Sequence, residues 1–240
     1  MKNIYYILLS IFLISCGEKN IEIENTVTEN LTQKQIDSVL VNFKFEYNNP
    51  MFIDSTNQVI LPITTKKQST KKIINKSSYY ESERPKYWNI LFYNSETGKT
   101  NLLTETKMSI SYFDFNLRNT GKILSKSILY KISSTDYNKD GILNHKDPEF
   151  LYISKNDGTD LKQISPKNEN LESYSIIPES DQIIIRTKRN INDNLNFDNE
   201  DEIIWYKIDL KLNSKPIEIV NSKERKKIEN LFFKQWLEKK

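Results

Sequence analysis

Residues 151–166 of the chain read LYISKNDGTDLKQISP, an apolar and aromatic run followed by a polar turn and a second short apolar run. Asn156, Asp157 and Gly158 suit the turn, because Asn and Asp bond to nearby backbone groups and Gly readily adopts a positive φ. Two β-prone runs separated by such a turn are typical of an antiparallel hairpin. The sequence therefore predicts a β-hairpin here.

The arrangement around this hairpin occurs three times along the chain. Each repeat has an apolar strand, a polar insert, a second aromatic-rich strand, a short turn and a last strand, and the repeats cover residues 57–105, 121–166 and 181–220. A possible fourth unit lies near residues 45–63. Repetition at this period predicts antiparallel four-stranded sheets.

The hairpin at residues 151–166 resembles the WD-like repeats of TolB-type β-propellers, in which a "D-G-x-x-x-x-x-L-T" hairpin closes each blade. The match is weaker over residues 90–105 and weakest over residues 205–220, where no glycine marks the turn. Three units are fewer than the six or seven blades usual in that family. The resemblance implies an all-β protein of antiparallel blade-like repeats, either a partial or irregular β-propeller or another stacked-sheet arrangement, with short terminal helices.

The N-terminus has the layout of a secretory signal. Lys2 precedes an apolar run that ends at Leu13-Ile14-Ser15-Cys16, and the run is too short for a permanent membrane span. Leu-Ile-Ser-Cys resembles the bacterial lipobox, which implies cleavage before Cys16 and lipid on its sulfur and amino group. An ordinary signal peptide and an uncleaved anchor are the alternatives. Cys16 is the single cysteine of the chain.

These observations predict three regions: a signal peptide at residues 1–15, a flexible tether at 16–31 and a β-repeat domain with terminal helices at 32–240. The resemblance implies a lipid-anchored protein of the cell envelope. Gly17 follows the cysteine, where an aspartate would resemble an inner-membrane retention signal, and its identity favours the outer membrane.

Two amphipathic helices are predicted at the ends of the domain. Thr32 and Gln35 form a capping-box pattern before apolar residues at helical spacing, which are Ile36, Val39, Leu40 and Phe43. In the C-terminal helix, five residues fall on adjoining faces: Ile228, Leu231, Phe232, Gln235 and Trp236. We expect the C-terminal helix to dock on the sheet. The alternative is binding to a membrane surface through its aromatic residues and lysines.

Residues 136–147, DYNKDGILNHKD, carry oxygen side chains at positions 1, 3, 5, 9 and 12, with Gly141 at position 6. This spacing predicts a Ca²⁺ site, because Ca²⁺ takes six to eight oxygen ligands. The expected ligands are Asp136, Asn138, Asp140, the Ile142 carbonyl, Asn144 and Asp147. The pattern resembles dockerin-type EF-hand loops, although the flanking residues are strand-like. Turn-rich loops also use Asp, Asn and Gly for backbone reasons alone.

A weaker version of this loop occupies residues 190–201, where Phe197, Asp198 and Asp201 align with Leu143, Asn144 and Asp147. Asparagines fill positions 1, 3 and 5, and Leu195 replaces the glycine, so we expect a much lower metal affinity.

The corresponding insert of the first repeat is basic and aromatic. It offers a possible surface for glycans or acidic polymers, made of Lys71, Lys72, Tyr79, Tyr80, Arg84, Lys86, Tyr87 and Trp88. The alternative is a solvated loop whose aromatic residues begin the next strand.

Composition and motifs restrict the function. The formal net charge is +3, which indicates no nucleic-acid partner. His145 is the single histidine and lies in the predicted calcium loop, and no nucleophile or phosphate-binding motif occurs. We therefore expect a lipid-anchored envelope protein that binds a protein or glycan or acts as a scaffold, rather than an enzyme. The alternative is a propeller-type carbohydrate-active hydrolase using paired carboxylates, which no catalytic residue singles out.

Overall fold

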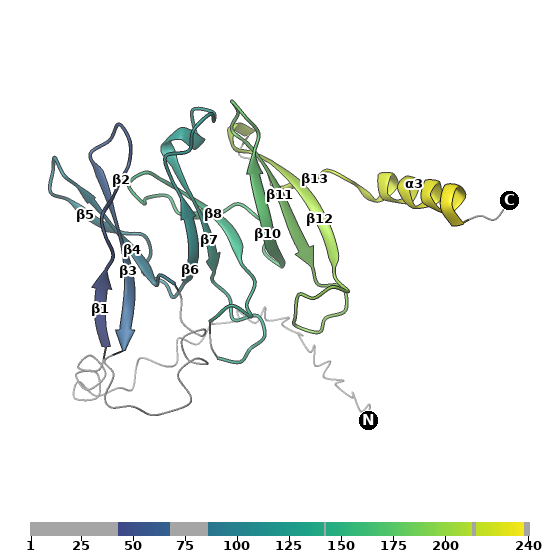
Figure 1. The fold of residues 1–240 in the computed structure, drawn as a ribbon, viewed down its shortest axis with the longest axis horizontal. Coiled ribbons are helices and arrows are strands. Elements are labelled where there is room, and N and C mark those ends of the chain that lie inside the picture. The colour runs from purple at the N-terminus through teal and green to yellow at the C-terminus, as the bar shows by residue number, and fades with distance from the viewer. Residues whose placement is uncertain (1–42, 68–85, 142, 213–214, 238–240) are drawn as a thin grey trace, which may run out of the picture. The chain divides into compact units, whose positions relative to one another are not determined.

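The computed structural model describes residues 43–67, 86–141, 143–212 and 215–237. Within them the chain forms three antiparallel β-sheets, each built from a continuous part of the sequence (Figure 1). The first sheet contains β1 (Phe43–Tyr47), β2 (Met51–Phe52), β3 (Gln58–Lys67), β4 (Asn89–Asn94) and β5 (Thr100–Leu102). Strand β3 is central, because it pairs with β1, β2 and β4.

The second and third sheets have four strands each, in sequence order. The second contains β6 (Ser109–Asp114), β7 (Ser127–Ser133), β8 (Phe150–Lys155) and β9 (Lys162–Gln163). The third contains β10 (Glu169–Ile176), β11 (Gln182–Arg189), β12 (Glu202–Asp209) and β13 (Ile217–Glu218). The predicted all-β fold with antiparallel sheets is confirmed, and the described sheets do not close into a barrel or a propeller.

The predicted repeats supply three strands of each sheet, and the remaining strands come from segments that precede the repeats. Strands β6 and β10 pair with β7 and β11 as outer strands of the second and third sheets. The possible fourth unit near residues 45–63 is wrong as a separate unit, because β1 and β2 pair with β3 inside the first sheet. Phe43, assigned to the N-terminal helix from its spacing, lies in β1 instead.

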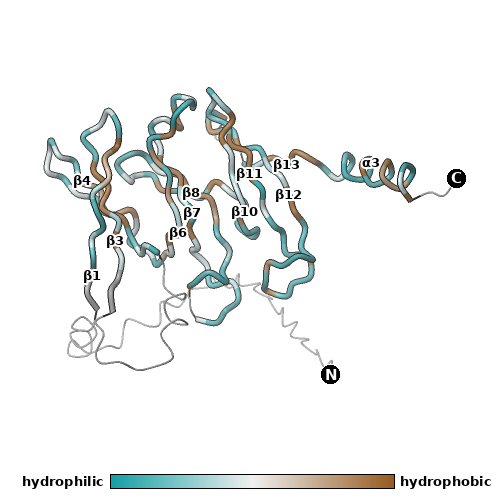
Figure 2. The backbone as a smooth tube through the Cα atoms, in the orientation of Figure 1, coloured by the Kyte–Doolittle hydropathy of each residue, from teal (hydrophilic) through white to brown (hydrophobic). Residues whose placement is uncertain are grey.

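The second sheet is buried on both faces. Successive side chains of a strand point to opposite faces, and in β7 the side chains of Ile128, Tyr130 and Ile132 join one apolar core while Leu129 joins the other. In β8, Phe150 and Tyr152 lie in the first core, and the second holds Leu151 and Ile153. The first core also contains residues of the first sheet and the second core residues of the third, so the sheets stack face to face. Figure 2 shows the apolar residues along their strands.

A buried carboxylate joins the third sheet to the second. Oδ1 of Asp181 accepts hydrogen bonds from the backbone N–H groups of Ile123 and Leu124, at 2.8 and 3.0 Å. These groups begin the short 3₁₀ turn η1 (Leu124–Lys126), which leads into β7. A Cβ atom at Gly121 would lie 2.3 Å from the Asp181 carboxyl carbon. Only glycine therefore permits this close approach.

The C-terminal helix α3 (Ser222–Phe232) continues into a wider π turn, η3 (Phe233–Leu237). The predicted helix is present, but neither segment has a buried residue, so the expectation that it docks on the sheet is wrong. Helical turns are also not confined to the ends, since η1 and η2 (Leu210–Leu212) lie inside the β domain. No helix in the described ranges combines the length and apolar character needed to cross a bilayer.

The double burial of the second sheet leads to a stability prediction. Replacing Leu151 by Ala removes a fully buried side chain from the second core, and we expect a loss of about 2–5 kcal/mol in the free energy of unfolding. Urea denaturation followed by circular dichroism measures it. Leu212→Ala is the matched control, because that side chain is 73% exposed and should change stability by less than about 0.5 kcal/mol. Similar losses in both variants would contradict the core assignment.

Candidate functional site

The two loops with calcium-type spacing lie side by side. Residues 136–147 follow β7 and precede β8, and residues 190–201 join β11 to β12 (Figure 1). The rings of Tyr137 and Phe197 are in contact, with centroids 5.0 Å apart and an interplanar angle of 35°. These loops of the second and third sheets therefore meet beyond the ends of their strands.

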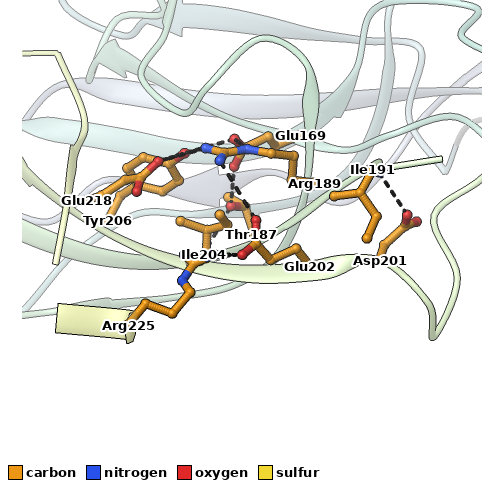
Figure 3. Close-up of polar contacts among 10 residues, drawn as sticks. All are labelled: Glu169, Thr187, Arg189, Ile191, Asp201, Glu202, Ile204, Tyr206, Glu218 and Arg225. Carbon is orange, nitrogen blue, oxygen red and sulfur yellow. Dashed lines mark hydrogen bonds and ion pairs between the residues drawn. The ribbon is translucent and has the colours of Figure 1, made fainter. Parts of the chain in front are cut away.

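Both loops are closed by the aspartate at position 12. In the first loop the Asp147 carboxylate accepts from the N–H groups of Tyr137 and Asn144, at 2.8 and 2.9 Å. In the second loop the Asp201 carboxylate accepts from the N–H groups of Ile191 and Asp198, at 3.2 and 2.9 Å. The donors occupy positions 2 and 9 in each case. The sequence alignment of the two loops thus corresponds to the same three-dimensional closure, and Figure 3 includes the Ile191–Asp201 bond.

The backbone of the two loops turns in the same way. Positions 4 and 6 have positive φ in both, with Lys139 at 59° and Gly141 at 82° in the first loop, and Asp193 at 56° and Leu195 at 59° in the second. The second loop therefore makes the turn without a glycine, although a leucine with positive φ is strained. The two loops therefore share a left-handed backbone conformation at positions 4 and 6.

In the first loop, side-chain oxygens at positions 1 and 3 bind the backbone. The Asp136 carboxylate accepts from the N–H groups of Asp140 and Gly141, at 3.2 and 2.8 Å. Oδ1 of Asn138 also accepts from the Asp140 N–H at 3.0 Å. These bonds hold the first half of the loop around the side chains at positions 1 and 3.

In the second loop, amide groups connect positions that a cation would join. Nδ2 of Asn190 donates to the carbonyl of Asn196 at 3.2 Å, linking positions 1 and 7. Nδ2 of Asn194 donates to the Asp198 carboxylate at 3.0 Å, linking positions 5 and 9. Hydrogen bonds from the backbone N–H of Glu200 and then from this amide lower the pKa of Asp198. The second loop is thus cross-linked by its own neutral donors.

The predicted calcium ligands lie within one loop. Asn144 and Asp147 are buried, Asp140 is exposed, and the predicted ligand Ile142 lies outside the described residues. Among the described side chains, no group of three or more His, Cys, Asp or Glu is placed to hold a metal. Each carboxylate oxygen of Asp147 accepts one hydrogen bond from the loop backbone and has a second lone pair. The oxygen ligands of the loop suit a hard cation such as Ca²⁺ once the carboxylates move closer to one another.

A cavity of about 530 Å³ adjoins the first loop. Leu143, at position 8 of the loop, forms part of its wall, with Trp88 and Met108 as other large lining side chains. Glu105 is the single acid among the described lining residues, and Lys107 is the single base. The cavity is mainly apolar with a few polar groups at its surface, as small-ligand sites commonly are.

The aromatic residues before β4 make contacts within the fold. The backbone of Tyr87 pairs with Ile110, and its ring packs edge-on against Phe113 with centroids 5.6 Å apart. The backbone N–H of Trp88 donates to the Ile63 carbonyl at 3.1 Å. Both residues lie directly before β4. Lys86 is exposed, and its Nζ lies 5.4 Å from the centroid of the Tyr87 ring. The remaining residues of the predicted glycan surface, Lys71, Lys72, Tyr79, Tyr80 and Arg84, lie outside the described ranges.

Next to the second loop, the structure shows a charged cluster that the sequence did not predict (Figure 3). The Glu169 carboxylate, which is 5% exposed, accepts from Arg189 Nε at 2.7 Å and from the Tyr206 hydroxyl at 2.8 Å. Thr187 also donates to it at 2.5 Å, and Arg189 reaches Glu218 at 2.8 Å. Burial and then Glu169 raise the pKa of Tyr206 above the ordinary tyrosine value. The cluster is saturated with internal partners, which is characteristic of a structural role.

The cluster extends toward the C-terminal helix through Glu202. This carboxylate lies 3.9 Å from Arg189 and forms an ion pair with Arg225 in the first turn of α3. The helix is therefore connected to β12 by a charged side chain at its beginning. The sequence signal for the cluster is the pair Arg189 and Glu202, which flank the second loop directly.

Comparisons with known proteins identify no family. No protein-family model matches the chain, and no curated protein matches it in sequence. The predicted lipidation site, Cys16, lies outside the described residues. Fold and site together define a mainly β protein of stacked antiparallel sheets, in which two matched loops lie at the strand ends of the second and third sheets.

The shared turn leads to a prediction for a pair of variants. Leu195→Gly should raise the free energy of unfolding by up to about 1 kcal/mol, since glycine relieves the cost of a left-handed backbone. Gly141→Ala should lower it by about 1 kcal/mol. No atom lies within 4 Å of a Cβ built at Gly141, so the effect reports backbone conformation and not crowding. Urea denaturation in the presence of a chelator measures both, and opposite signs to these would rule out the shared turn.

Proposed function

We propose that the protein is a lipid-anchored binding or scaffold protein of the cell envelope, located at the outer membrane. In this proposal its three sheets act as blade-like units of an open stack. The face-to-face packing of one five-stranded and two four-stranded units, each continuous in sequence, supports the likeness to a partial propeller. The N-terminal Leu13-Ile14-Ser15-Cys16 pattern supports the anchor. Strands of this kind provide a rigid frame, and the loops at their ends provide the contacts.

We further propose that the first loop holds a structural Ca²⁺. The observation that carries this proposal is a difference in side chains between two loops that share the positive φ angles and the closing aspartate. Amide donors of Asn190 and Asn194 cross-link the second loop, whereas the first has the carboxylates of Asp136 and Asp140 at the same positions. Carboxylates at these positions repel one another unless a cation lies between them. Ca²⁺ would take the part that the amides play in the second loop.

A calcium ion in the first loop would also act on the neighbouring cavity. Leu143 belongs to both the loop and the cavity wall, so ordering the loop would fix one side of the cavity. A mainly apolar cavity with Trp88, Glu105 and Lys107 at its lining suits a protein segment or a glycan ring. In this proposal the metal is structural and the cavity binds the partner.

A carbohydrate-active hydrolase is the weaker candidate. Such enzymes use two carboxyl groups separated by roughly 5–9.5 Å on either side of the substrate. Glu105 is the single acid among the described residues of the cavity wall. The acids of the charged cluster, Glu169 and Glu218, are already bound by Arg189. No specific observation therefore favours the hydrolase.

Calcium should stabilise the protein through the first loop. At a concentration of about 100 times its dissociation constant the gain is about 2.7 kcal/mol, which raises the melting temperature by several degrees in a domain of this size. Calcium should do this more than magnesium, because Mg²⁺ demands a tighter octahedral site. Asp136→Ala with Asp140→Ala should abolish the shift. Differential scanning calorimetry with and without calcium provides the measurement.

The second loop supplies the matched control. Asn190→Ala with Asn194→Ala removes the amide cross-links of the sister loop, so this variant should melt lower yet keep the full calcium shift. A wild-type protein that binds no calcium up to several millimolar in titration calorimetry would show that residues 136–147 form only a hydrogen-bonded turn.

The anchor is tested independently of the metal. Growth with a labelled fatty acid should mark the wild-type protein and leave Cys16→Ala unmarked, because Cys16 supplies the sulfur for acylation. The label is read from the purified protein after electrophoresis. Equal labelling of the two proteins would exclude the lipoprotein assignment.

A further inference from the structure

The C-terminal segment exposes a row of large apolar side chains. Ile228 is 57% exposed, Phe232 55% and Trp236 75%, and no residue of α3 or η3 is buried. In a helix these three positions and Leu231 fall on one side, because residues three and four apart are neighbours. We call this row the helix surface. Contiguous exposed apolar residues of this kind mark an interaction site.

The contacts that hold the helix among the described residues lie at its beginning. The side chain of Asn221 accepts from the N–H groups of Lys223 and Glu224, and Glu224 in turn accepts from the Asn221 N–H, which forms a capping box. Arg225 pairs with Glu202 of the third sheet. An isolated helix shorter than about 12–15 residues is marginal in water. The end that carries Phe232 and Trp236 therefore gains stability when another surface covers it.

Charge indicates which surface this is. Residues 222–237 carry five basic and two acidic side chains, and at 100° per residue the lysines lie away from the helix surface. The charged residues on the outer face of the third sheet are Arg186, Lys188, Lys207, Glu172 and Asp209, and the same face exposes the side chains of Trp205 and Ile217. These charges sum to slightly basic, in the chain's own third sheet and in that of a second copy. A basic helix therefore gains no net charge attraction from this face, whereas an anionic surface attracts it.

We propose that residues 222–237 form an interfacial helix that binds a bilayer with anionic headgroups. The helix surface enters the boundary between headgroups and acyl chains, and the lysines stay at the phosphate level. Basic helices with aromatic residues on the apolar face bind in this way, through apolar burial together with attraction to anionic lipid. The aromatic residues suit this depth, because Trp is enriched at the membrane interface.

This contact is separate from the anchor at Cys16. It would hold the third sheet close to the membrane, because Arg225 connects the helix to β12. The two contacts together would restrict the orientation of the domain on the membrane surface.

Hydrogen exchange of the full chain, followed by mass spectrometry, tests the proposal. The protein is measured in buffer, with vesicles of phosphatidylglycerol and phosphatidylethanolamine in equal parts, and with vesicles of phosphatidylcholine. Exchange of the amides of residues 228–237 should slow at least tenfold with the anionic vesicles and much less with phosphatidylcholine. The readout is local to the helix, so it is informative whether or not the N-terminus also holds the protein on the vesicles.

Variants distinguish the helix surface from general adhesion. Phe232→Ser with Trp236→Ser should lose the slowing, and Lys226→Gln with Lys227→Gln should reduce it. Phe52→Ser is the matched control, since Phe52 is 67% exposed on the first sheet, and it should keep the wild-type response.

Two results would overturn the proposal. Helix amides that exchange equally fast with and without anionic vesicles would show that no bilayer covers the helix. Amides that are slow in buffer, and slower at higher protein concentration, would show that a second copy of the chain covers it instead.

Discussion

The burial of the second sheet on both faces is the constraint on which the rest of the structure depends. A strand that alternates between two cores, as β7 does with Tyr130 on one side and Leu129 on the other, needs a covering sheet on each side. The first and third sheets supply these covers. Antiparallel sheets commonly face water on one side, and here that role falls to the two outer members of the stack. The order of the three sheets follows from this requirement.

The sequence predicted the strands that are apolar or aromatic throughout, such as β8, because those residues report burial directly. It missed β6 and β10, whose serines and acids alternate with apolar residues in outer strands of their sheets. It also placed Phe43 in a helix, since helical spacing over a short stretch does not exclude a strand. The expectation that α3 docks on the sheet failed for a related reason. An amphipathic pattern shows that a surface is needed but does not identify the surface.

The loops show what spacing alone can and cannot establish. The offset that aligned Asp201 with Asp147 was sufficient to predict that the two loops correspond. Leu195 replaces the glycine of the first loop, yet the backbone keeps a positive φ there. The preference for glycine is an energetic cost of about 1–2 kcal/mol, and the hydrogen bonds of the surrounding loop offset it. The charged cluster around Glu169 could not be predicted, because its members share a site only once the register of β10, β11 and β12 is known.

Each sheet is formed by one uninterrupted part of the chain, and this has a consequence for how the protein assembles. Strand pairing joins sequence neighbours, and no strand of the third sheet has to find a partner in the first. Folding of such an array can advance sheet by sheet, with each new sheet adding to a face that the previous one left open. During synthesis the first sheet is complete before the third is made. The third sheet, held by one core and by the Asp181 contact, is then the last to join.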